Sequence, residues 1–556
     1  MSQASSDAGR VFSARPASVS PWVVAALGIA ALVAVPVAAV LSSLTTPAVE
    51  IWAHLWRTQL VELTWNTVRL LAGVGAGTLV LGTALAWLVV HHRFPGRAAF
   101  EWALVLPLAM PAYVIGFACL GLFDFAGPVQ TALRRAFGES LRLPEIRSYG
   151  GVTLMMVLVY YPYVYLLART AFRAQGGATL ETARSLGRSR LVAFLRVTLP
   201  LARPSLVAGA ALAMMEALAD FGTVATFGYR TYTEAIYRVW YGMFERIAAT
   251  QLASVLLLFA FALILLERSS RGRQRFTQGM RRGPATMPLP LTGWRAWAAT
   301  ATCAAVLTLA FLLPVGQLAW WGIEAVREGR VSRDFPVLLA NTLFLAALAS
   351  ATACVFAVVL AYAGRLHPSR AVQVAGQFAS MGYALPGSVI AVGVLLPLAW
   401  VDHGAGALLE RVLGRPVGLF LTGSAIGLVG AYVVRFLAVS LQTVDASLTR
   451  ISPILDNAAR SLGARAGGVL RRVHVPMIRG GLATALILVF VETMKEMPAT
   501  LLLRPFGFNT LSVEVWERTS EALWHEAAVP ALAIVGAGLL PVILAIRWST
   551  RDARGR

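Results

Sequence analysis

Apolar residues follow one another along this chain in about twelve long stretches, interrupted by short polar segments. A helix needs about 20 mostly apolar residues to cross a bilayer, and the stretches do not alternate polar and apolar residues as the strands of a membrane barrel would. The pattern predicts an all-α membrane protein with about 12 transmembrane helices. The expected spans are 21–42, 66–90, 103–125, 150–170, 204–224, 249–266, 296–317, 340–363, 374–399, 418–440, 480–501 and 527–547.

Composition supports the membrane interpretation. Hydrophobic residues make up 58% of the chain and charged residues 13%, whereas soluble domains carry about 45–50% and about 25%. The net charge of +21 comes mostly from arginines in short polar segments. Residues 169–203 and 267–295 each hold seven arginines and one acid. Because cytoplasmic loops are enriched in basic residues, we expect these segments and both termini on the cytoplasmic side of the inner (plasma) membrane, in contact with lipids and without a nucleic-acid partner.

The second half of the chain repeats the first at an offset of 275 or 276 residues. Asn66-Thr67 returns as Asn341-Thr342, and Pro111 returns as Pro386. Further pairs follow in order: Pro200 and Pro476, Glu216 and Glu492, and Trp240 and Trp516. An ordered series at one spacing predicts two parallel six-helix repeats, related by an axis along the membrane normal with a pathway between them. We also expect Pro111 and Pro386 to kink or interrupt their spans.

The repeat and the composition divide the chain into five parts. These are a cytoplasmic N-terminal tail (1–20), a first six-helix repeat (21–266), a cytoplasmic Arg/Gly/Pro-rich linker (267–295), a second six-helix repeat (296–547) and a cytoplasmic tail (548–556).

The chain carries no recognisable catalytic constellation. Its single lysine, Lys495, is followed by Glu496 and so cannot belong to a Gly-Lys-Ser/Thr phosphate-binding loop. Its three cysteines lie in apolar stretches without metal-binding spacing. We therefore predict a protein that is not an enzyme, and we assign it no catalytic residue, no bound cofactor and no firm metal site.

The most informative motif occurs once in each half, on the predicted cytoplasmic side. The first copy, near 178–203, contains Glu181, Ala183, Gly187 and Pro200; the second, near 453–479, contains Asn457, Ala459, Gly463 and Pro476. In both copies three residues separate the alanine from the glycine. Each copy predicts a short helix, a glycine break, a second amphipathic stretch and a proline near the start of the next span.

These residues resemble the cytoplasmic loop of ABC-importer permeases, which has Glu-Ala-Ala, three residues, glycine, nine residues, an aliphatic residue, one further residue and a terminal Leu-Pro. The second copy departs from that pattern because Asn457 stands where the acid usually is. Segments such as Lys495–Gly507 and Val513–Glu517 narrow the resemblance to fused permeases of ferric-iron (Fe³⁺) importers, over roughly residues 20–548.

The resemblance implies a type I ABC importer permease that works by alternating access. The two loops would be coupling helices that dock two copies of an ATPase subunit, and ATP with Mg²⁺ would bind to that partner. A periplasmic or lipid-anchored binding protein would deliver the cargo. We expect ferric iron to be the cargo; thiamine and 2-aminoethylphosphonate, whose permeases share the architecture, are the alternatives. A different class, an ion-coupled secondary transporter, would leave the paired loops unexplained.

Charged residues inside spans are costly and therefore suggest function. The candidates for the translocation pathway are Glu216, Asp220, Glu492, Lys495, Glu496 and Arg504. Counting about 1.5 Å per helical residue places the first five in the outer half of the membrane. Their carboxylates would suit a hard cation such as Fe³⁺, whereas Lys495 and Arg504 would suit an anion. Alternatively, Glu492 and Lys495 neutralise one another and the other acids bond to neighbouring helices.

Overall fold

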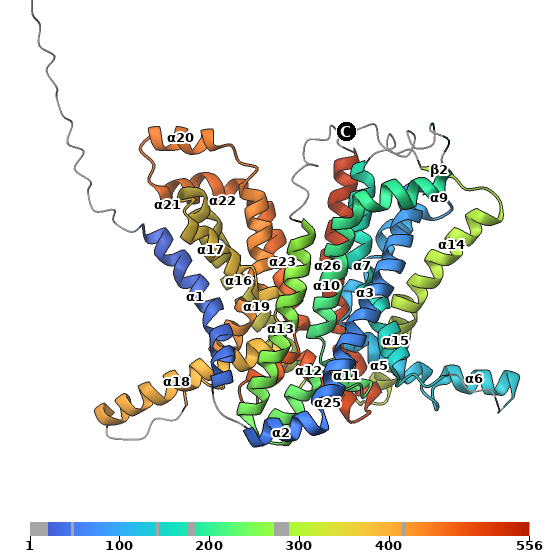
Figure 1. Cartoon of the computed structure of the whole chain (residues 1–556), viewed down its shortest axis with the longest axis horizontal. Helices are drawn as coiled ribbons and strands as arrows, with labels where there is room; N and C mark the ends of the chain where they lie inside the picture. The colour runs from blue at the N-terminus through green and yellow to red at the C-terminus, as the bar shows by residue number, and fades with distance from the viewer. Residues whose placement is uncertain are drawn as a thin grey trace, which may run out of the picture.

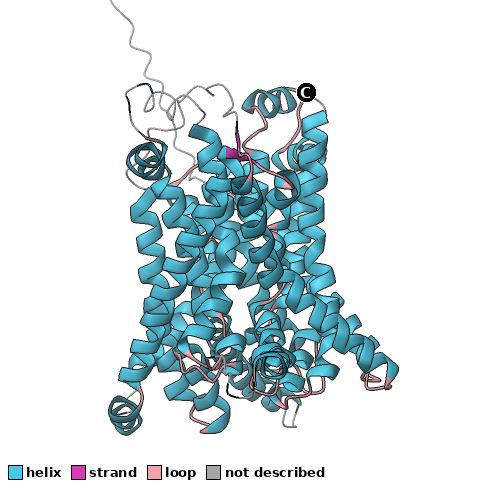
Figure 2. Ribbon diagram, turned by 90° about the vertical axis from the view of Figure 1, so that its right-hand side faces the viewer, coloured by secondary structure: helices cyan, strands magenta, loops and turns pink. Residues whose placement is uncertain are grey.

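The structure is a computed structural model that describes residues 20–45, 49–138, 140, 144–175, 185, 187, 189–271, 288–413 and 419–554. Helices run the length of the molecule, and shorter helices lie across its two ends (Figures 1 and 2). Among the described residues, eleven helices are long and apolar enough to span a membrane. A twelfth results when the pair Ala466–Met477 and Arg479–Lys495, bent by 78°, counts as one span. The predicted all-helical fold is confirmed.

The helices of the first half are α1 (Pro21–Ser42), α2 (Val49–Thr58), α3 (Leu60–His91), α4 (Arg97–Ala103), α5 (Ala112–Phe123), α6 (Pro128–Phe137), α7 (Tyr149–Gln175), α9 (Arg190–Ala193), α10 (Leu199–Ala219), α11 (Gly222–Thr226), α12 (Tyr232–Tyr237) and α13 (Arg246–Arg271). Short 3-10 or π turns connect some of them: η1 (Ser43–Thr45), η2 (Leu106–Ala109), η3 (Phe194–Thr198) and η4 (Arg238–Gly242).

The helices of the second half are α14 (Trp294–Leu307), α15 (Leu313–Arg327), α16 (Phe335–Leu366), α17 (Arg370–Ala379), α18 (Gly387–Leu413), α19 (Ala425–Leu448), α20 (Pro453–Ser461), α21 (Ala466–Val469), α22 (Val475–Met477), α23 (Arg479–Lys495), α24 (Pro498–Leu503), α25 (Leu511–Ser520) and α26 (Trp524–Arg554). The connecting turns are η5 (Thr308–Leu312), η6 (Gly382–Ala384) and η7 (Leu470–His474).

The two halves are built on the same three-helix core. In the first half α7 packs against both α3 and α10, and in the second half α19 packs against both α16 and α23. Small residues permit the close approach in the first core. A Cβ on Gly82 would lie 2.9 Å from the carbonyl oxygen of Tyr161, so a larger residue there would push α3 away from α7.

The first span of each half packs against the opposite half. Helix α1 contacts α16, α17 and α18 of the second half, and α14 and α15 contact α4 and α5 of the first. A short parallel strand pair adds another link, in which β1 (His92–Arg93) pairs with β2 (Leu289–Pro290). The two halves of the chain therefore do not pack as two separate units, because the first span of each half lies against the other half.

Both matched prolines interrupt the helices of their spans, as predicted. Pro111 has an extended backbone and directly precedes α5, and Pro386 directly precedes α18. Proline lacks the N–H that continues a helix. The expected spans 103–125 and 374–399 each begin within a short helix, cross a 3-10 turn and enter a second helix.

Two other expected spans are broken where the sequence suggested continuous helices. The span 204–224 ends its helix at Ala219, and the span 480–501 ends its helix at Lys495. Asp220 and Glu496 follow these helices with extended backbones. Glu216 and Asp220 are four positions apart, as two residues on one helix face would be, but Asp220 lies outside α10 and does not continue that face.

Candidate functional site

The broken spans leave a carboxylate at each helix break. Asp220 accepts hydrogen bonds from the backbone N–H of Thr223 at 2.9 Å and from its hydroxyl at 2.6 Å. Glu496 accepts a hydrogen bond from the backbone N–H of Ala499 at 2.9 Å. Thr223 and Ala499 are the second residues of α11 and α24. Each carboxylate therefore caps a short helix and favours the break, because the first N–H groups of a helix need outside acceptors.

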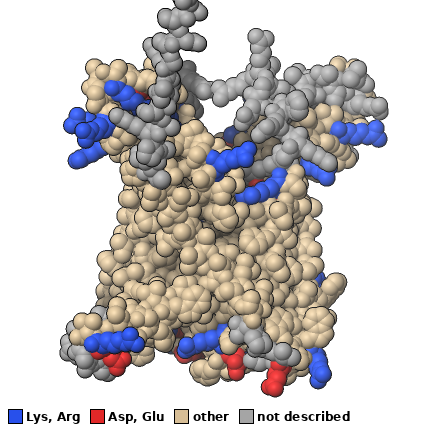
Figure 3. All heavy atoms as spheres, turned by 60° about the vertical axis from the view of Figure 1, so that its left-hand side comes forward, with Lys and Arg blue, Asp and Glu red and all other residues tan. Residues whose placement is uncertain are grey.

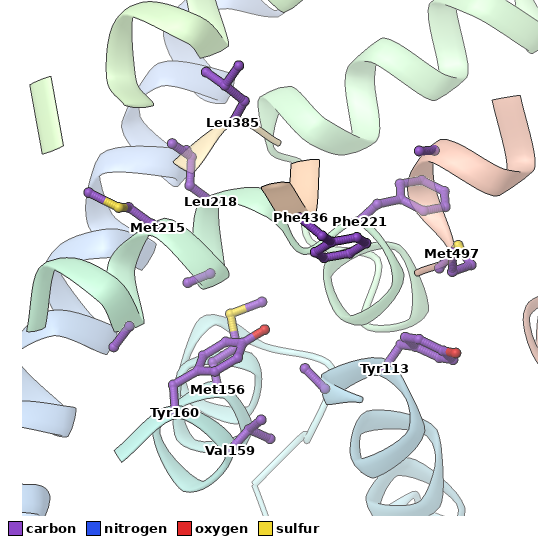
Figure 4. Close-up of a cluster of buried hydrophobic side chains, with 14 of the residues drawn as sticks. Tyr113, Met156, Val159, Tyr160, Met215, Leu218, Phe221, Leu385, Phe436 and Met497 are labelled. Atoms are coloured by element: carbon purple, nitrogen blue, oxygen red, sulfur yellow. The ribbon is translucent and has the colours of Figure 1, made fainter. Parts of the chain in front are cut away.

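A cavity of about 100 Å³ lies between the two halves at these breaks. Acidic, basic and phenolic side chains contribute to its wall, together with apolar ones. Figure 4 shows part of the apolar wall, where Tyr113 and Tyr160 of the first half lie near Phe436 and Met497 of the second. The polar lining residues are Tyr113, Tyr160, Tyr163, Glu216, Asp220, Tyr383, Arg435, Glu492, Lys495 and Glu496.

The structure brings five of the six candidate pathway residues to this cavity: Glu216, Asp220, Glu492, Lys495 and Glu496. The sixth, Arg504, is not among the lining residues. Its guanidinium instead pairs with Glu517 at 2.7 Å and bonds to Asn509, at the far end of α24. In this conformation Arg504 belongs to a separate polar cluster.

Each cavity carboxylate already has a partner. Lys495 donates to Glu492 at 2.7 Å and to the carbonyl of Leu108 at 3.3 Å. Arg435 pairs with Glu496 at 3.4 Å.

Glu216 bonds to the hydroxyl of Tyr383, which comes from η6 of the other half. Two of these contacts, Tyr383 with Glu216 and Lys495 with Leu108, join one half to the other.

Sequence reasoning missed Arg435 and the four tyrosines of the cavity. Arg435 lies within the expected span 418–440, and the rule that identifies charged residues inside spans would have found it. The tyrosines carry no such signal, because an aromatic residue in a span more often belongs to the core.

Several polar atoms near the cavity lack hydrogen-bond partners among the described residues. They include the hydroxyl of Tyr113 and the Nη1 atom of Arg435, and both residues are at least nine-tenths buried. Nowhere in the described part of the chain do three or more Asp, Glu, His or Cys side chains form a group that could hold a metal ion. The cavity therefore offers oxygen atoms without a preassembled metal cage.

The second copy of the cytoplasmic motif forms a helix across one end of the molecule (Figure 1). Asn457 and Ala459 lie on α20, which ends at Ser461, and Gly463 follows with a φ of +82° that favours glycine. The N–H groups of Gly463 and Ala464 donate to the carbonyls of Arg460 and Ala459, as in a Schellman motif. Pro476 then lies in α22 after the π turn η7, as the motif predicted.

Helix α20 presents apolar side chains to the outside. Ile454 is 73% exposed, and Leu462, which directly follows the helix, is 89% exposed. Exposed apolar side chains on an amphipathic helix suit a protein interface.

A buried ion pair holds α20 to the helices behind it. The Nε atom of Arg365, in the last turn of α16, donates to Asp456 at 2.7 Å, and His474 bonds to the other carboxylate oxygen. Burial alone would raise the pKa of Asp456, but the hydrogen bonds from Arg365 and His474 outweigh it and hold the pKa below its usual value. Sequence reasoning missed this cluster.

Parts of the first copy of the motif, Glu181 and Ala183, lie outside the described residues. Gly187 is described, and its φ of +77° matches that of Gly463. Pro200 lies in the first turn of α10 after the π turn η3, as Pro476 follows η7.

The charges at the two ends of the molecule differ. Figure 3 shows an uncharged belt, with mainly basic side chains at the α20 end and both acidic and basic side chains at the opposite end. In membrane proteins the cytoplasmic loops carry an excess of lysine and arginine.

Residues 78–269 match the family described as binding-protein-dependent transport system inner membrane component. The sulfate transport system permease protein CysT of Salmonella typhimurium is 30% identical over 237 residues, which are 40% of this chain and 82% of that protein. This chain belongs to that family. It is a multi-pass inner-membrane permease of an ABC importer, a transport subunit.

Another relative matches both halves of the permease. The Fe(3+)-transport system permease protein FbpB 2 of Haemophilus influenzae is 27% identical over 499 residues, which are 89% of this chain and 91% of that protein. The molybdenum transport system permease protein ModB of Escherichia coli is 30% identical over 172 residues, 31% of this chain and 71% of that protein. The fused arrangement of two repeats thus has a full-length counterpart among ferric permeases.

Proposed function

We propose that this permease carries ferric iron, delivered by a periplasmic binding protein, into the cytoplasm. The observation that supports it most is the cavity between the halves, where carboxylate and phenol oxygens surround a space of about 100 Å³. Fe³⁺ is a hard cation, and hard cations prefer oxygen ligands. The nearly full-length likeness to a ferric permease supports the same cargo.

The proposed orientation places the α20 end in the cytoplasm, with both termini. Two ATPase subunits, which bind ATP and Mg²⁺, would dock on the two loops, one at Gly187 and the other on α20. The binding protein would dock at the opposite end. The exposed apolar side chains of α20 and the basic α20 end support this arrangement.

The residues of this chain perform three tasks in the proposed cycle. The coupling loops receive the movement of the ATPase, and the Arg365–Asp456 pair passes it from α20 to α16. The halves then separate at cross-half contacts such as that between Tyr383 and Glu216. The cavity carboxylates bind the cation weakly enough to release it, because a deep site would stall transport.

Uptake of radiolabelled ferric iron tests the cargo. Iron-limited cells that lack other ferric importers should lose uptake when this gene is deleted and regain it when the gene is restored. Unchanged uptake in the deletion strain would refute ferric iron as cargo, while the permease assignment would remain.

An anionic or zwitterionic cargo is the second candidate, because Arg435 and Tyr113 offer unpaired donors at the cavity. 2-Aminoethylphosphonate represents this class, and thiamine is the cationic organic alternative. Competition of each unlabelled compound against labelled iron separates the candidates: ferric iron alone should compete.

A further inference from the structure

The cavity contains an internal cation at the place where a cationic cargo would bind. Lys495 is the only lysine of the chain. Its ammonium lies 2.7 Å from Glu492, and its side chain is 14% exposed. A lysine ammonium is a compact point charge on a flexible four-carbon stem, so it can leave a carboxylate without moving a helix.

The two glutamates at matched positions of the repeat both line the cavity but have different partners. Glu216 and Glu492 occupy matched positions on α10 and α23. Glu492 is neutralised by Lys495, whereas the position matched to Lys495 in the first half is Ala219. Glu216 has the hydroxyl of Tyr383 as its hydrogen-bond partner.

The other two cavity carboxylates are committed to the fold. Asp220 and Glu496 cap α11 and α24, and Glu496 also pairs with Arg435. Glu216 and Glu492 are therefore the acids that can exchange partners without loosening a helix end. Of the two cavity cations, Lys495 is the one that holds an exchangeable acid.

We propose that Lys495 is a tethered counter-ion, whose ammonium occupies the cation position beside Glu492 until a more highly charged cation displaces it. This inference rests on the proposed cationic cargo. At equal distance a trivalent ion attracts a carboxylate about three times as strongly as an ammonium does, whereas a sodium ion has no such advantage. The lysine would thus keep small monovalent cations out of a carboxylate-lined pathway and yield to Fe³⁺.

The test uses the complete importer, with its ATPase and binding protein, in liposomes, and follows radioactive sodium and radioactive ferric iron in the presence of ATP. Lys495→Met removes the charge and keeps the length of the side chain. We expect it to raise ATP-dependent sodium flux about tenfold, because an uncompensated carboxylate then remains in the cavity. Lys495→Arg should keep sodium flux low.

The double variant Lys495→Met/Glu492→Gln is the matched control. It removes the ammonium and its carboxylate together, so sodium flux should return to the wild-type value. Equal ATP hydrolysis by all variants shows that the complexes are assembled.

Sodium flux in Lys495→Met equal to that of the wild type would overturn the tethered counter-ion. The same holds if Lys495→Met abolishes iron uptake with sodium flux still low, because Lys495 would then act as a required ligand or support. If the wild-type complex itself carries no ferric iron, the proposed function fails instead. The two failures are therefore distinguishable.

Discussion

Asp220 and Glu496, 276 residues apart in the chain, do the same task in the two halves: each accepts a hydrogen bond from the second residue of a short helix that follows a break. In a membrane, an unsatisfied N–H at a helix start is more costly than in water. The two carboxylates thus maintain the broken geometry that borders the cavity.

Capping predicts that Asp220→Ala destabilises the permease more than Asp220→Asn. Loss of a capping side chain costs about 1 kcal/mol, and asparagine caps about as well as aspartate. Thermal unfolding of the purified permease in detergent measures the difference. If both variants unfold at the same lowered temperature, the charge of Asp220 matters and not its hydrogen bonds.

The positive φ of Gly463 predicts that Gly463→Ala weakens coupling. A residue with a Cβ in the left-handed region costs about 1–2 kcal/mol, so the end of α20 should shift or fray. We expect lower affinity for the ATPase and reduced iron uptake. Gly468→Ala is the control, since Gly468 has an ordinary φ and open space around it, and it should behave like the wild type.

The anchor of α20 predicts that Asp456→Asn uncouples transport from ATP hydrolysis. Breaking a buried ion pair costs about 3–5 kcal/mol, and here it frees α20 from Arg365 and His474. ATP hydrolysis by the assembled complex should continue while iron uptake falls. Asp445→Asn, an exposed acid of α19, should change neither; an unaffected Asp456→Asn variant would show that the anchor is dispensable.

The lowered pKa of Asp456 predicts an acid-sensitive α20. A group whose pKa is lower in the folded state stabilises that state above its unfolded pKa, about 3.9 for aspartate, and loses this contribution as the pH falls further. Hydrogen exchange of the α20 amides, corrected for intrinsic rates, should therefore rise below about pH 4. Asp456→Asn should lack this pH-dependent increase, and a similar increase in that variant would assign it to another group.

Because the first span of each half packs on the opposite half, we predict that the permease stays assembled when its linker is cut. Residues 1–279 and 280–556, expressed together as separate chains, should purify as one complex, because α1 packs on α16–α18 and α15 packs on α5. Removing α1 from the first piece should weaken the complex. Pieces that purify separately would show that the covalent linker is needed.

The sequence predicted the spans and the interruptions at Pro111 and Pro386, because both depend on local properties: apolar length and a missing N–H. It also indicated the carboxylates that line the cavity, because charge inside an apolar span is conspicuous. It missed the breaks at Asp220 and Glu496, since an acid that caps a helix and an acid that faces a pathway look alike in a sequence.

The tertiary partners could not be predicted. Arg504 has the same charge as Arg435, yet the first bonds to Glu517 away from the cavity and the second lines it. Which arginine meets the cavity depends on how α19 and α24 pack. The Arg365–Asp456–His474 cluster joins residues up to 109 positions apart, and no local sequence pattern predicts it.

Because α1 packs on the second half, it cannot make these contacts until the second half has been synthesised. Its partners α16–α18 begin about 290 residues after α1 ends. A ribosome that adds about 5–20 residues per second needs on the order of tens of seconds to make them. Throughout that interval α1 must stay in the bilayer without these partners, with α13 of its own half as the neighbour that is made earlier, and the absence of charged residues from Pro21 to Ser42 fits this state.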